Sequence, residues 1–253
     1  MTKVKVLVTG MSGRIGTALN NHLGHKYSFT GLTRNPMTGI DNVTADVTDL
    51  DSITPHFKGH KTVVHLAAAL SDGYSIDDII NRNVKGVYNV YEAARIAGVE
   101  RVIFASSGNT IVGYTLDSPY KEIEAGQYHL IRDNWRRITH LDPVRPNNPY
   151  GASKVWGEAL GRYYSDYHGL SVLCIRFGWL PQENRPSDDS RTYSVWTSHQ
   201  DAAQMVDLCI KAPDELRFDT FFCLSNNKWG YRDLNHARET LNYEPIDNAE
   251  DYR

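Results

Sequence analysis

The sequence predicts an α/β protein built on a doubly wound parallel sheet with helices on both faces. The chain opens with a short valine-rich run, and glycines at three-residue spacing follow it. Short apolar runs then alternate with segments of helical periodicity along most of the chain. Such alternation is typical of parallel strands joined by crossover helices. The 253 residues suffice for one large domain, or for one domain with a small appendage.

Composition and charge exclude several classes of partner. A net charge of −3 indicates neither nucleic acid nor an anionic membrane as a partner. No apolar run approaches the roughly 20 residues of a membrane span, and the first strand begins too early for a signal peptide. The three cysteines lack CxxC spacing and are typical of buried thiols in a reducing cytoplasm. We therefore expect a cytoplasmic protein. We expect no metal site either, because His22 and His25 have no third ligand nearby.

The first predicted strand and the helix after it indicate a phosphate-binding turn. Gly10, Gly13 and Gly16 lie between the valine-rich run and the helical pattern that continues to Leu23. Glycine lets the backbone approach a ligand, and a helix N-terminus offers free N–H groups and the positive end of its dipole. A plain tight turn is the alternative, but the position after a first buried strand favours a dinucleotide site. The residues expected to bind the cofactor here are Gly10, Ser12, Gly13, Arg14, Ile15 and Gly16.

The end of the second predicted strand, 27–32, indicates which cofactor is bound. An acidic residue at this strand end commonly bonds the ribose 2′-hydroxyl of NAD, whereas Thr33 and Arg34 stand here. An arginine suits a 2′-phosphate through charge-assisted bonds, which favours NADP over NAD. An ordinary surface arginine is the alternative. After a third strand at 42–45 come Asp46 and Val47. The Asp46 carboxylate could accept a hydrogen bond from the adenine amino group, or cap the next helix, 49–57.

The fourth strand and the long segment after it supply further cofactor contacts. The strand at 62–66 ends in Leu66, Ala67 and Ala68, and small side chains at a strand end leave space for a flat cofactor. The segment 76–97 has helical periodicity, and Asn83 interrupts its apolar face. Because a buried asparagine needs hydrogen-bond partners, Asn83 is expected to brace a neighbouring loop.

The fifth strand, 101–107, and a later helix carry the candidate catalytic residues. The strand ends in Ser106 and Ser107, at the edge where open parallel sheets bind ligands. A helix from Pro149 to about residue 167 carries Tyr150 and Lys154 on one face. A neighbouring ammonium favours the phenolate form of a tyrosine, which can then take the proton of an alcohol. A serine hydroxyl can hold the oxygen of that alcohol.

The remaining segments suggest a cover and a lid. Periodicity is lost between 114 and 149, and the aromatic residues there favour a functional cover over a disordered segment. A sixth strand at 170–176 completes the predicted dinucleotide-binding domain, 1–178. Residues 179–253 contain a polar loop at 181–191, helices at 199–210 and 231–241, and a short strand at 221–224. This part is too small to fold independently, and we expect it to form a substrate-binding lid over the strand ends.

Six motifs carry a family resemblance, namely TGMSGRIG at 9–16, Asp46-Val47, HLAA at 65–68, NVKGVYNVYEAA at 83–94, FASS at 104–107 and YGASK at 150–154. They resemble the extended short-chain dehydrogenase/reductase superfamily, in its NAD-dependent epimerase/dehydratase branch. The resemblance runs from Val4 to the C-terminus. RTYSVWTSHQD at 191–201 and the ending YEPIDNAEDYR are most similar to uronate dehydrogenases and related archaeal sugar dehydrogenases.

The resemblance implies a Rossmann-type fold and an enzyme that oxidises a free sugar, a sugar acid or a sugar phosphate at C1 to the lactone. It implies Tyr150 as the base and Lys154 as its activator and a ribose ligand. Ser107 would donate to the substrate oxygen, and Asn83 would support the site. The substrate contacts that it implies are Ser71, Ser107, Gly108, Asn109, Trp179 and Arg191, with Arg191 on an anionic group. It also implies a homodimer formed through the helices at 76–97 and 150–167.

Two alternatives accompany this interpretation. The first is a sugar-nucleotide epimerase or dehydratase with tightly bound NAD, although about 75 residues after the sixth strand are few for holding a nucleotide. The second is a non-catalytic dinucleotide sensor, which would have no need of Ser107, Tyr150 and Lys154. The chain departs from the uronate dehydrogenase pattern at Trp179 and at Gly108-Asn109, which reshapes the predicted pocket.

Overall fold

In the computed structural model, which describes residues 3–70, 73–132 and 134–253, seven parallel strands form one sheet. Their order across the sheet is β3-β2-β1-β4-β5-β6-β7. The strands are β1 (Val4–Thr9), β2 (Tyr27–Thr33), β3 (Asp41–Thr44), β4 (Thr62–His65), β5 (Arg101–Ser107), β6 (Ser171–Phe177) and β7 (Phe218–Cys223). The predicted doubly wound parallel sheet is thereby confirmed.

The strand order places a ligand site between β1 and β4. The chain runs outward from β1 to β2 and β3, then returns to β4 on the other side of β1. The loops that follow β1 and β4 therefore diverge at their C-terminal ends. Open α/β sheets bind ligands in the crevice that such a reversal of strand order leaves.

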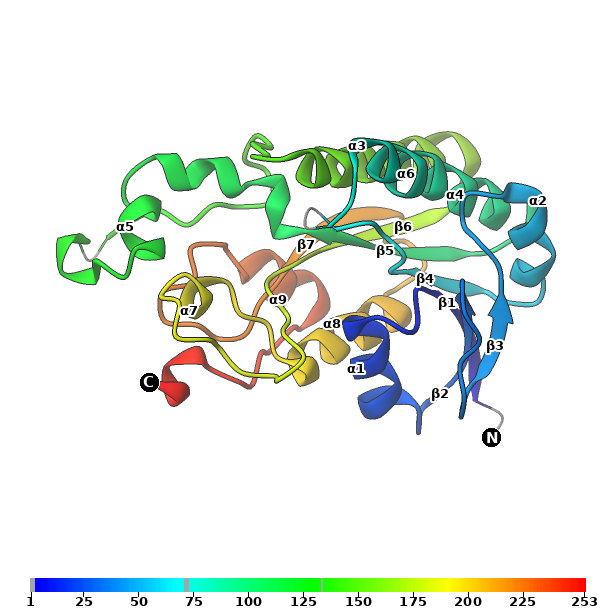
Figure 1. The fold of residues 1–253 in the computed structure, drawn as a ribbon, viewed down its shortest axis with the longest axis horizontal. Coiled ribbons are helices and arrows are strands. Elements are labelled where there is room, and N and C mark those ends of the chain that lie inside the picture. The colour runs from blue at the N-terminus through cyan, green and yellow to red at the C-terminus, as the bar shows by residue number, and fades with distance from the viewer. Residues whose placement is uncertain (1–2, 71–72, 133) are drawn as a thin grey trace.

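Helices cover both faces of the sheet (Figure 1). On one face lie α4 and α6 with α2 and α3 beside them, and on the other lie α1, α8 and α9. The helices are α1 (Arg14–Leu23), α2 (Leu50–Ile53), α3 (Ile76–Ile79), α4 (Gly86–Ala97), α5 (Tyr120–Glu124), α6 (Pro149–His168), α7 (Thr192–Val195), α8 (His199–Lys211) and α9 (Asn235–Leu241). The segment predicted as one helix, 76–97, is α3 and α4 joined by a π-helical stretch, Ile80–Lys85.

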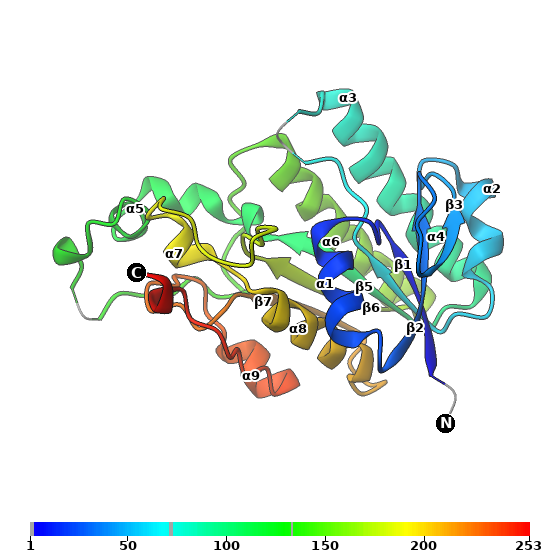
Figure 2. The same cartoon turned by 60° about the horizontal axis from the view of Figure 1, so that its bottom comes forward.

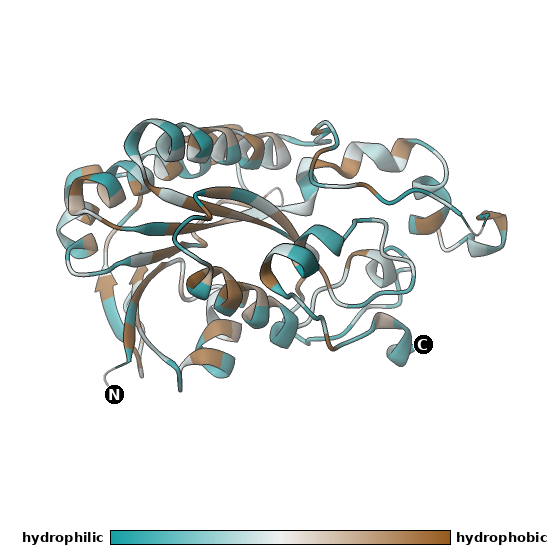
Figure 3. Ribbon diagram, turned by 180° about the vertical axis from the view of Figure 1, so that it is seen from behind, coloured by the Kyte–Doolittle hydropathy of each residue, from teal (hydrophilic) through white to brown (hydrophobic). Residues whose placement is uncertain are grey.

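The apolar alternation of the strands separates the two halves of the core. On β1, Leu7 belongs to the cluster under α4 and α6, whereas Val6 and Val8 belong to the cluster under α1 and α8. Successive side chains of a strand point to opposite faces, so a sheet covered on both sides needs apolar residues at every position. In Figure 3 the apolar colour lies mostly on the strands and on the helix faces turned toward them.

The C-terminal part shares this core. β7 comes from the residues predicted as a lid, yet it pairs in parallel with β6 from Val172 to Phe177. α8 packs beside α1 under the same sheet, as Figure 2 shows. The chain after residue 178 therefore completes the sheet and covers part of one face. No helix in the described part of the chain is long and apolar enough to cross a membrane.

The predicted cover, 114–149, and the segment before α8 meet beyond the strand ends. α5 lies within the first of these segments and α7 within the second, and the two helices are neighbours in Figures 1 and 2. The Ser190 hydroxyl donates to the backbone oxygen of Glu124 at 2.8 Å. Because both segments follow strands that end at the same edge of the sheet, they enclose the space in front of β5 and β6.

Candidate active site

The glycine turn after β1 brings two backbone segments into close approach. Gly10 has a φ of +71°, and a Cβ atom on it would fall 2.7 Å from the backbone nitrogen of Ala67. A Cβ atom on Gly16 would fall 2.2 Å from the backbone oxygen of Met11. Gly13 precedes α1, and no described side chain caps the first turn of that helix. The turn therefore leaves helix N–H groups free beside a tightly packed backbone, as phosphate binding requires.

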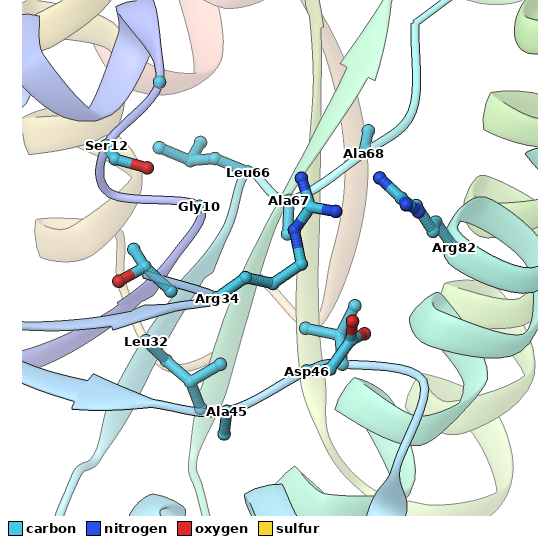
Figure 4. Close-up of a pocket in the computed structure, with 13 residues that line it drawn as sticks. Gly10, Ser12, Leu32, Arg34, Ala45, Asp46, Leu66, Ala67, Ala68 and Arg82 are labelled. Carbon is cyan, nitrogen blue, oxygen red and sulfur yellow. The ribbon is translucent and has the colours of Figure 1, made fainter. Parts of the chain in front are cut away.

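A pocket extends from this turn across the ends of β1, β2 and β4 (Figure 4). Most of the predicted cofactor residues line it, namely Gly10, Ser12, Gly13, Thr33, Arg34, Asp46, Val47, Leu66, Ala67 and Ala68. Leu32, Ala45 and Arg82, which the sequence analysis missed, line it too. Arg14, Ile15 and Gly16 begin α1 behind the turn. The shape and the glycine turn fit an extended dinucleotide with its phosphates at α1.

Two guanidinium groups turn toward the same space in this pocket (Figure 4). Arg34 follows β2 and is exposed. Arg82 comes from the π-helical stretch, where its Nη2 lies 3.4 Å from Oδ1 of Asp78. The sequence offered one signal for Arg82, because it precedes Asn83, which was expected to brace a neighbouring loop. Together the two arginines make this end of the pocket suited to an anion.

Asp46 keeps its carboxylate at the pocket. Its Oδ1 accepts from the backbone N–H of Thr48 at 2.9 Å, which leaves Oδ2 available to a ligand. Asp49 caps α2 instead, by accepting from the N–H of Ser52 at 3.1 Å. The alternative in which Asp46 caps the helix is therefore wrong.

The three residues predicted to catalyse come together at the end of β5. α6 begins at Pro149 because the Asn148 side chain accepts from the N–H of Gly151 at 2.7 Å. This cap places Tyr150 in the first turn. One turn later, Nζ of Lys154 donates to the backbone oxygen of Ala105 at 2.8 Å and lies 5.5 Å from the centre of the Tyr150 ring.

Burial governs the ionisation of these groups. Burial raises the pKa of the Tyr150 phenol, and a hydrogen bond from Ser107 opposes that rise. Burial also lowers the pKa of the Lys154 ammonium to about 7, although the nearby Glu158 carboxylate acts in the other direction. The sequence analysis expected the ammonium to favour the phenolate. Instead, removal from water disfavours the charged form of both groups, and this effect outweighs their attraction in the unliganded chain.

A buried polar network supports Lys154 and Tyr150 from below. Glu158, one turn after Lys154 on α6, accepts two bonds from Arg176 at 2.8 Å each. It also accepts from the Ser106 hydroxyl at 2.5 Å. The sequence signal for Glu158 was its spacing of four residues from Lys154. The network fixes α6 against β5 and β6, and thereby fixes the height of the two reacting side chains above the sheet.

Asn83 braces two parts of the site, as predicted for a buried asparagine. Its Oδ1 accepts from the N–H of Ala69 at 2.7 Å, and its Nδ2 donates to the Ala69 oxygen at 2.8 Å. The same Nδ2 donates to the Ser153 hydroxyl at 3.0 Å. Asn83 thus ties the loop after β4 to the helix that carries Tyr150 and Lys154.

The predicted substrate residues differ in where they lie and in what they contact. The Ser107 hydroxyl accepts from the N–H of Asn109 at 3.1 Å. Gly108 is buried against the guanidinium of Arg232. Trp179 follows β6, and its backbone bonds to Val195 at 2.6 Å. Ser71 lies outside the described residues.

Arg191, the predicted anion ligand, already has a carboxylate beside it. Its Nε lies 3.6 Å from Oε1 of Glu124, which belongs to α5. The Arg191 side chain is 46% exposed, so this pair is open to solvent and to exchange for another anion. Arg191 therefore stands where the cover and the segment before α7 meet.

A second group of polar side chains lies apart from these residues, at His140, Asp219 and His236. Nε2 of His236 lies 2.8 Å from Oδ1 of Asp219, and the rings of His140 and His236 stack with centres 3.6 Å apart. Parallel stacked rings point their nitrogen lone pairs side by side, whereas a metal needs them to converge. The arrangement fits a stacked pair held by a carboxylate better than a metal centre.

Comparison with known proteins relates the whole chain to enzymes of one family. Residues 6–204 match the sequence profile of the NAD dependent epimerase/dehydratase family. The chain is 31% identical to the NAD-dependent glucose-6-phosphate dehydrogenase of Haloferax volcanii over 98% of this chain and 95% of that protein. It is 33% identical to the L-arabinose 1-dehydrogenase (NAD(P)(+)) of the same organism, over 97% of each chain.

A solved structure is similar over the full length. The uronate dehydrogenase from Agrobacterium tumefaciens superposes with a TM-score of 0.84 at 30% identity, covering 100% of this chain and 88% of that one. The similarity thus includes the chain after residue 178 as well as the nucleotide-binding half.

Proposed function

The chain belongs to the NAD-dependent epimerase/dehydratase family of extended short-chain dehydrogenases/reductases, and from this premise we propose that it is an NAD(P)-dependent dehydrogenase of a sugar or sugar acid. The reaction proposed is oxidation at C1 to the lactone. The observation that carries the proposal is the position of Ser107, Tyr150 and Lys154. They converge at the end of β5, beside a pocket that fits a dinucleotide.

In the proposed mechanism Tyr150 is the general base. Ser107 donates a hydrogen bond to the C1 oxygen of the substrate and holds its hydroxyl toward Tyr150. The phenolate of Tyr150 then takes the hydroxyl proton as the C1–O bond gains double-bond character. A nicotinamide bound in the pocket beside these residues would supply the hydride acceptor for C1. Lys154, fixed by the Ala105 oxygen, places its ammonium below Tyr150 and stabilises the phenolate electrostatically. Asn83 holds α6 and the loop after β4 in a fixed position relative to each other.

The cofactor is a nicotinamide dinucleotide, and we propose NADP as the preferred form. Arg34 supported this choice from the sequence, and Arg82 faces the same end of the pocket. Arginine binds a phosphate group through paired, charge-assisted hydrogen bonds. Asp46 offers an acceptor at this end, since its Oδ2 makes no hydrogen bond within the described residues and suits the adenine amino group.

The two alternatives have less support. The glucose-6-phosphate, L-arabinose and uronate dehydrogenases are all named as dehydrogenases, and each alignment covers at least 97% of the present chain. An epimerase acting on a sugar nucleotide usually has a larger C-terminal region to hold the nucleotide, whereas only about 75 residues follow β6 here. A sensor would need neither a buried lysine nor the buried network that fixes it.

We also propose the homodimer expected through α4 and α6. These helices expose large apolar or aromatic side chains, which a partner could bury. Tyr88 and Ile96 on α4 are 45% and 51% exposed, and Trp156 and Tyr163 on α6 are 44% and 47% exposed. Light scattering of the purified protein, compared with a Trp156→Glu variant, tests this arrangement.

Initial rates of NAD(P)H formation test the proposed function. The purified protein would be assayed with glucuronate, galacturonate, glucose, glucose 6-phosphate and arabinose, each with NAD and with NADP. A clear rate with one sugar establishes the reaction class and the cofactor. A protein that binds cofactor but oxidises no sugar on the panel would contradict the proposal and favour a sugar-nucleotide substrate or a sensor.

A further inference from the structure

Arg232 places a buried guanidinium against the residue that follows Ser107. The Arg232 side chain is 3% exposed. A Cβ atom on Gly108 would fall 2.5 Å from its Cζ and 2.6 Å from its Nη2. The guanidinium therefore occupies the space that any side chain at position 108 would need, at the residue that follows Ser107 in the chain.

This guanidinium is largely without hydrogen-bond partners. Nε and Nη1 of Arg232 are buried and make no hydrogen bond within the described residues. Its Nη2 makes a long contact of 3.4 Å to the Tyr231 hydroxyl. An arginine stays charged inside a protein, and leaving its donors without acceptors is costly. A ligand that supplies the acceptors would satisfy these donors.

A short chain of contacts links Arg232 to the predicted anion ligand Arg191. The Tyr231 hydroxyl donates to Oε1 of Glu124 at 2.9 Å. The same oxygen lies 3.6 Å from Nε of Arg191. This cluster of Arg191, Glu124, Tyr231 and Arg232 thus holds two guanidinium groups and one carboxylate, so it carries a net positive charge.

We propose that Arg232 binds the anionic group of the substrate and so determines specificity for a sugar that carries a carboxylate or a phosphate. The inference rests on the proposed function, because Ser107 defines where the reacting carbon lies. A planar guanidinium holds a carboxylate or phosphate through two parallel bonds, made by Nη2 together with either Nε or Nη1. In Arg232, Nε and Nη1 have no partner within the described residues, and Nη2 makes only the long contact to the Tyr231 hydroxyl. A neutral sugar would leave the buried charge without an acceptor, so Arg232 discriminates against it.

A purely structural role is the competing explanation, since Arg232 also packs on the Tyr231 ring, with Cζ 5.1 Å from its centre. The two roles differ in what a substitution changes. A structural arginine supports every substrate equally, whereas an anion ligand supports anionic substrates alone. Two sugars that share a ring and differ at C6 therefore separate them, namely glucuronate with its carboxylate and glucose with its hydroxymethyl group.

The experiment compares Arg232→Met and Arg232→Lys with the wild type. We expect Arg232→Met to lower kcat/KM for the better anionic sugar, glucuronate or glucose 6-phosphate, by at least about 30-fold, because a buried charged partner is removed. The rate with glucose should stay within about threefold. Arg232→Lys keeps the charge and should recover part of the loss. Which anionic sugar is affected more identifies the carboxylate or the phosphate as the group bound.

Arg162→Met is the matched control, because Arg162 is exposed on α6 and pairs with Asp166 at 2.7 Å. It should leave the ratio of anionic to neutral activity unchanged. An equal loss for glucuronate, glucose 6-phosphate and glucose in Arg232→Met, with a lowered melting temperature, would assign Arg232 to structure and overturn the inference.

Calorimetric titration with glucuronate, and separately with inorganic phosphate, tests Arg232 without turnover. If the wild type oxidises no sugar, the proposed function fails, yet loss of anion binding in Arg232→Met would still support the anion site. Absence of anion binding to the wild type, or equal binding to Arg232→Met, would overturn the inference even if a neutral sugar is oxidised.

Discussion

Glu158 and Arg176 form a two-bond ion pair inside the protein, with Nε to Oε1 and Nη2 to Oε2 both at 2.8 Å. The Arg176 and Glu158 side chains are 4% and 9% exposed, so the pair is almost fully withdrawn from water. It joins β6 to α6 one turn beyond Lys154. Removing either partner would leave the other as an uncompensated buried charge.

Glu158→Gln should therefore destabilise the protein strongly. We expect a loss of roughly 3–5 kcal/mol in the free energy of unfolding, the range typical of a broken buried ion pair. The substitution also removes the carboxylate that holds the pKa of Lys154 up, so that pKa should fall below about 7. Urea unfolding measures the first effect. Glu239→Gln, an exposed position on α9, should change stability by less than about 0.5 kcal/mol, and a similarly small change at Glu158 would contradict the account.

Tyr150→Phe should abolish most turnover and leave cofactor binding intact. Removing a general base lowers the rate by about 10² to 10⁴, while the ring of residue 150 remains in place. The measurement is kcat together with a fluorescence titration of NADPH. Tyr167→Phe, at a position on the same helix that is 77% exposed, serves as the control. Unchanged turnover in Tyr150→Phe would refute the proposed mechanism.

Arg34→Ala and Arg82→Ala should each weaken NADP more than NAD. Hydrogen bonds to a charged group contribute about 1.5–3 kcal/mol, so each variant should lose roughly tenfold or more in affinity for NADP. NAD lacks the 2′-phosphate and should lose little. Dissociation constants for both cofactors, measured by titration, test this. Arg162→Ala, whose arginine pairs with Asp166 on the surface of α6, is the control. Equal losses of affinity for NAD and NADP would show that neither arginine binds the 2′-phosphate.

Lys154 should make stability depend on pH. Its pKa is lowered from 10.5 to about 7 in the folded chain. Between these values the unfolded chain binds a proton that the folded chain does not, so the contribution of Lys154 to stability rises with pH. It is constant below about pH 7, where both states are protonated.

Lys154→Met removes this contribution. Without cofactor, the variant should be more stable than the wild type at pH 7, and its advantage should shrink by up to about 1.4 kcal/mol per pH unit toward pH 10. Urea unfolding of both proteins at pH 7, 8 and 9 gives this difference. A difference that does not vary with pH would show that the Lys154 pKa is near its ordinary value in the folded protein.

The sequence by itself determined the architecture and the reacting residues. Six of the seven strands were predicted within about one residue of their bounds, and β7 was predicted at 221–224, three residues late. The reason is that a strand buried on both faces is a continuous apolar run and that the helices between strands carry their own periodicity. The glycine turn was predictable because the positive φ of Gly10 and the close contact of Gly16 with the Met11 backbone are both set within the turn itself. Tyr150 and Lys154 were found because residues four apart on a helix share a face.

The tertiary structure alone decided which distant groups share a site. Arg82 lines the same pocket as Arg34, Arg232 packs against Gly108, and Arg176 forms an ion pair with Glu158. In each case the two residues belong to different elements of the chain. The structure also placed β7 in the main sheet. It set the direction in which the pKa of Tyr150 moves, because that depends on how much water is excluded around it. Local patterns record which face a side chain takes, whereas burial and charge pairing depend on what the rest of the fold brings opposite that face.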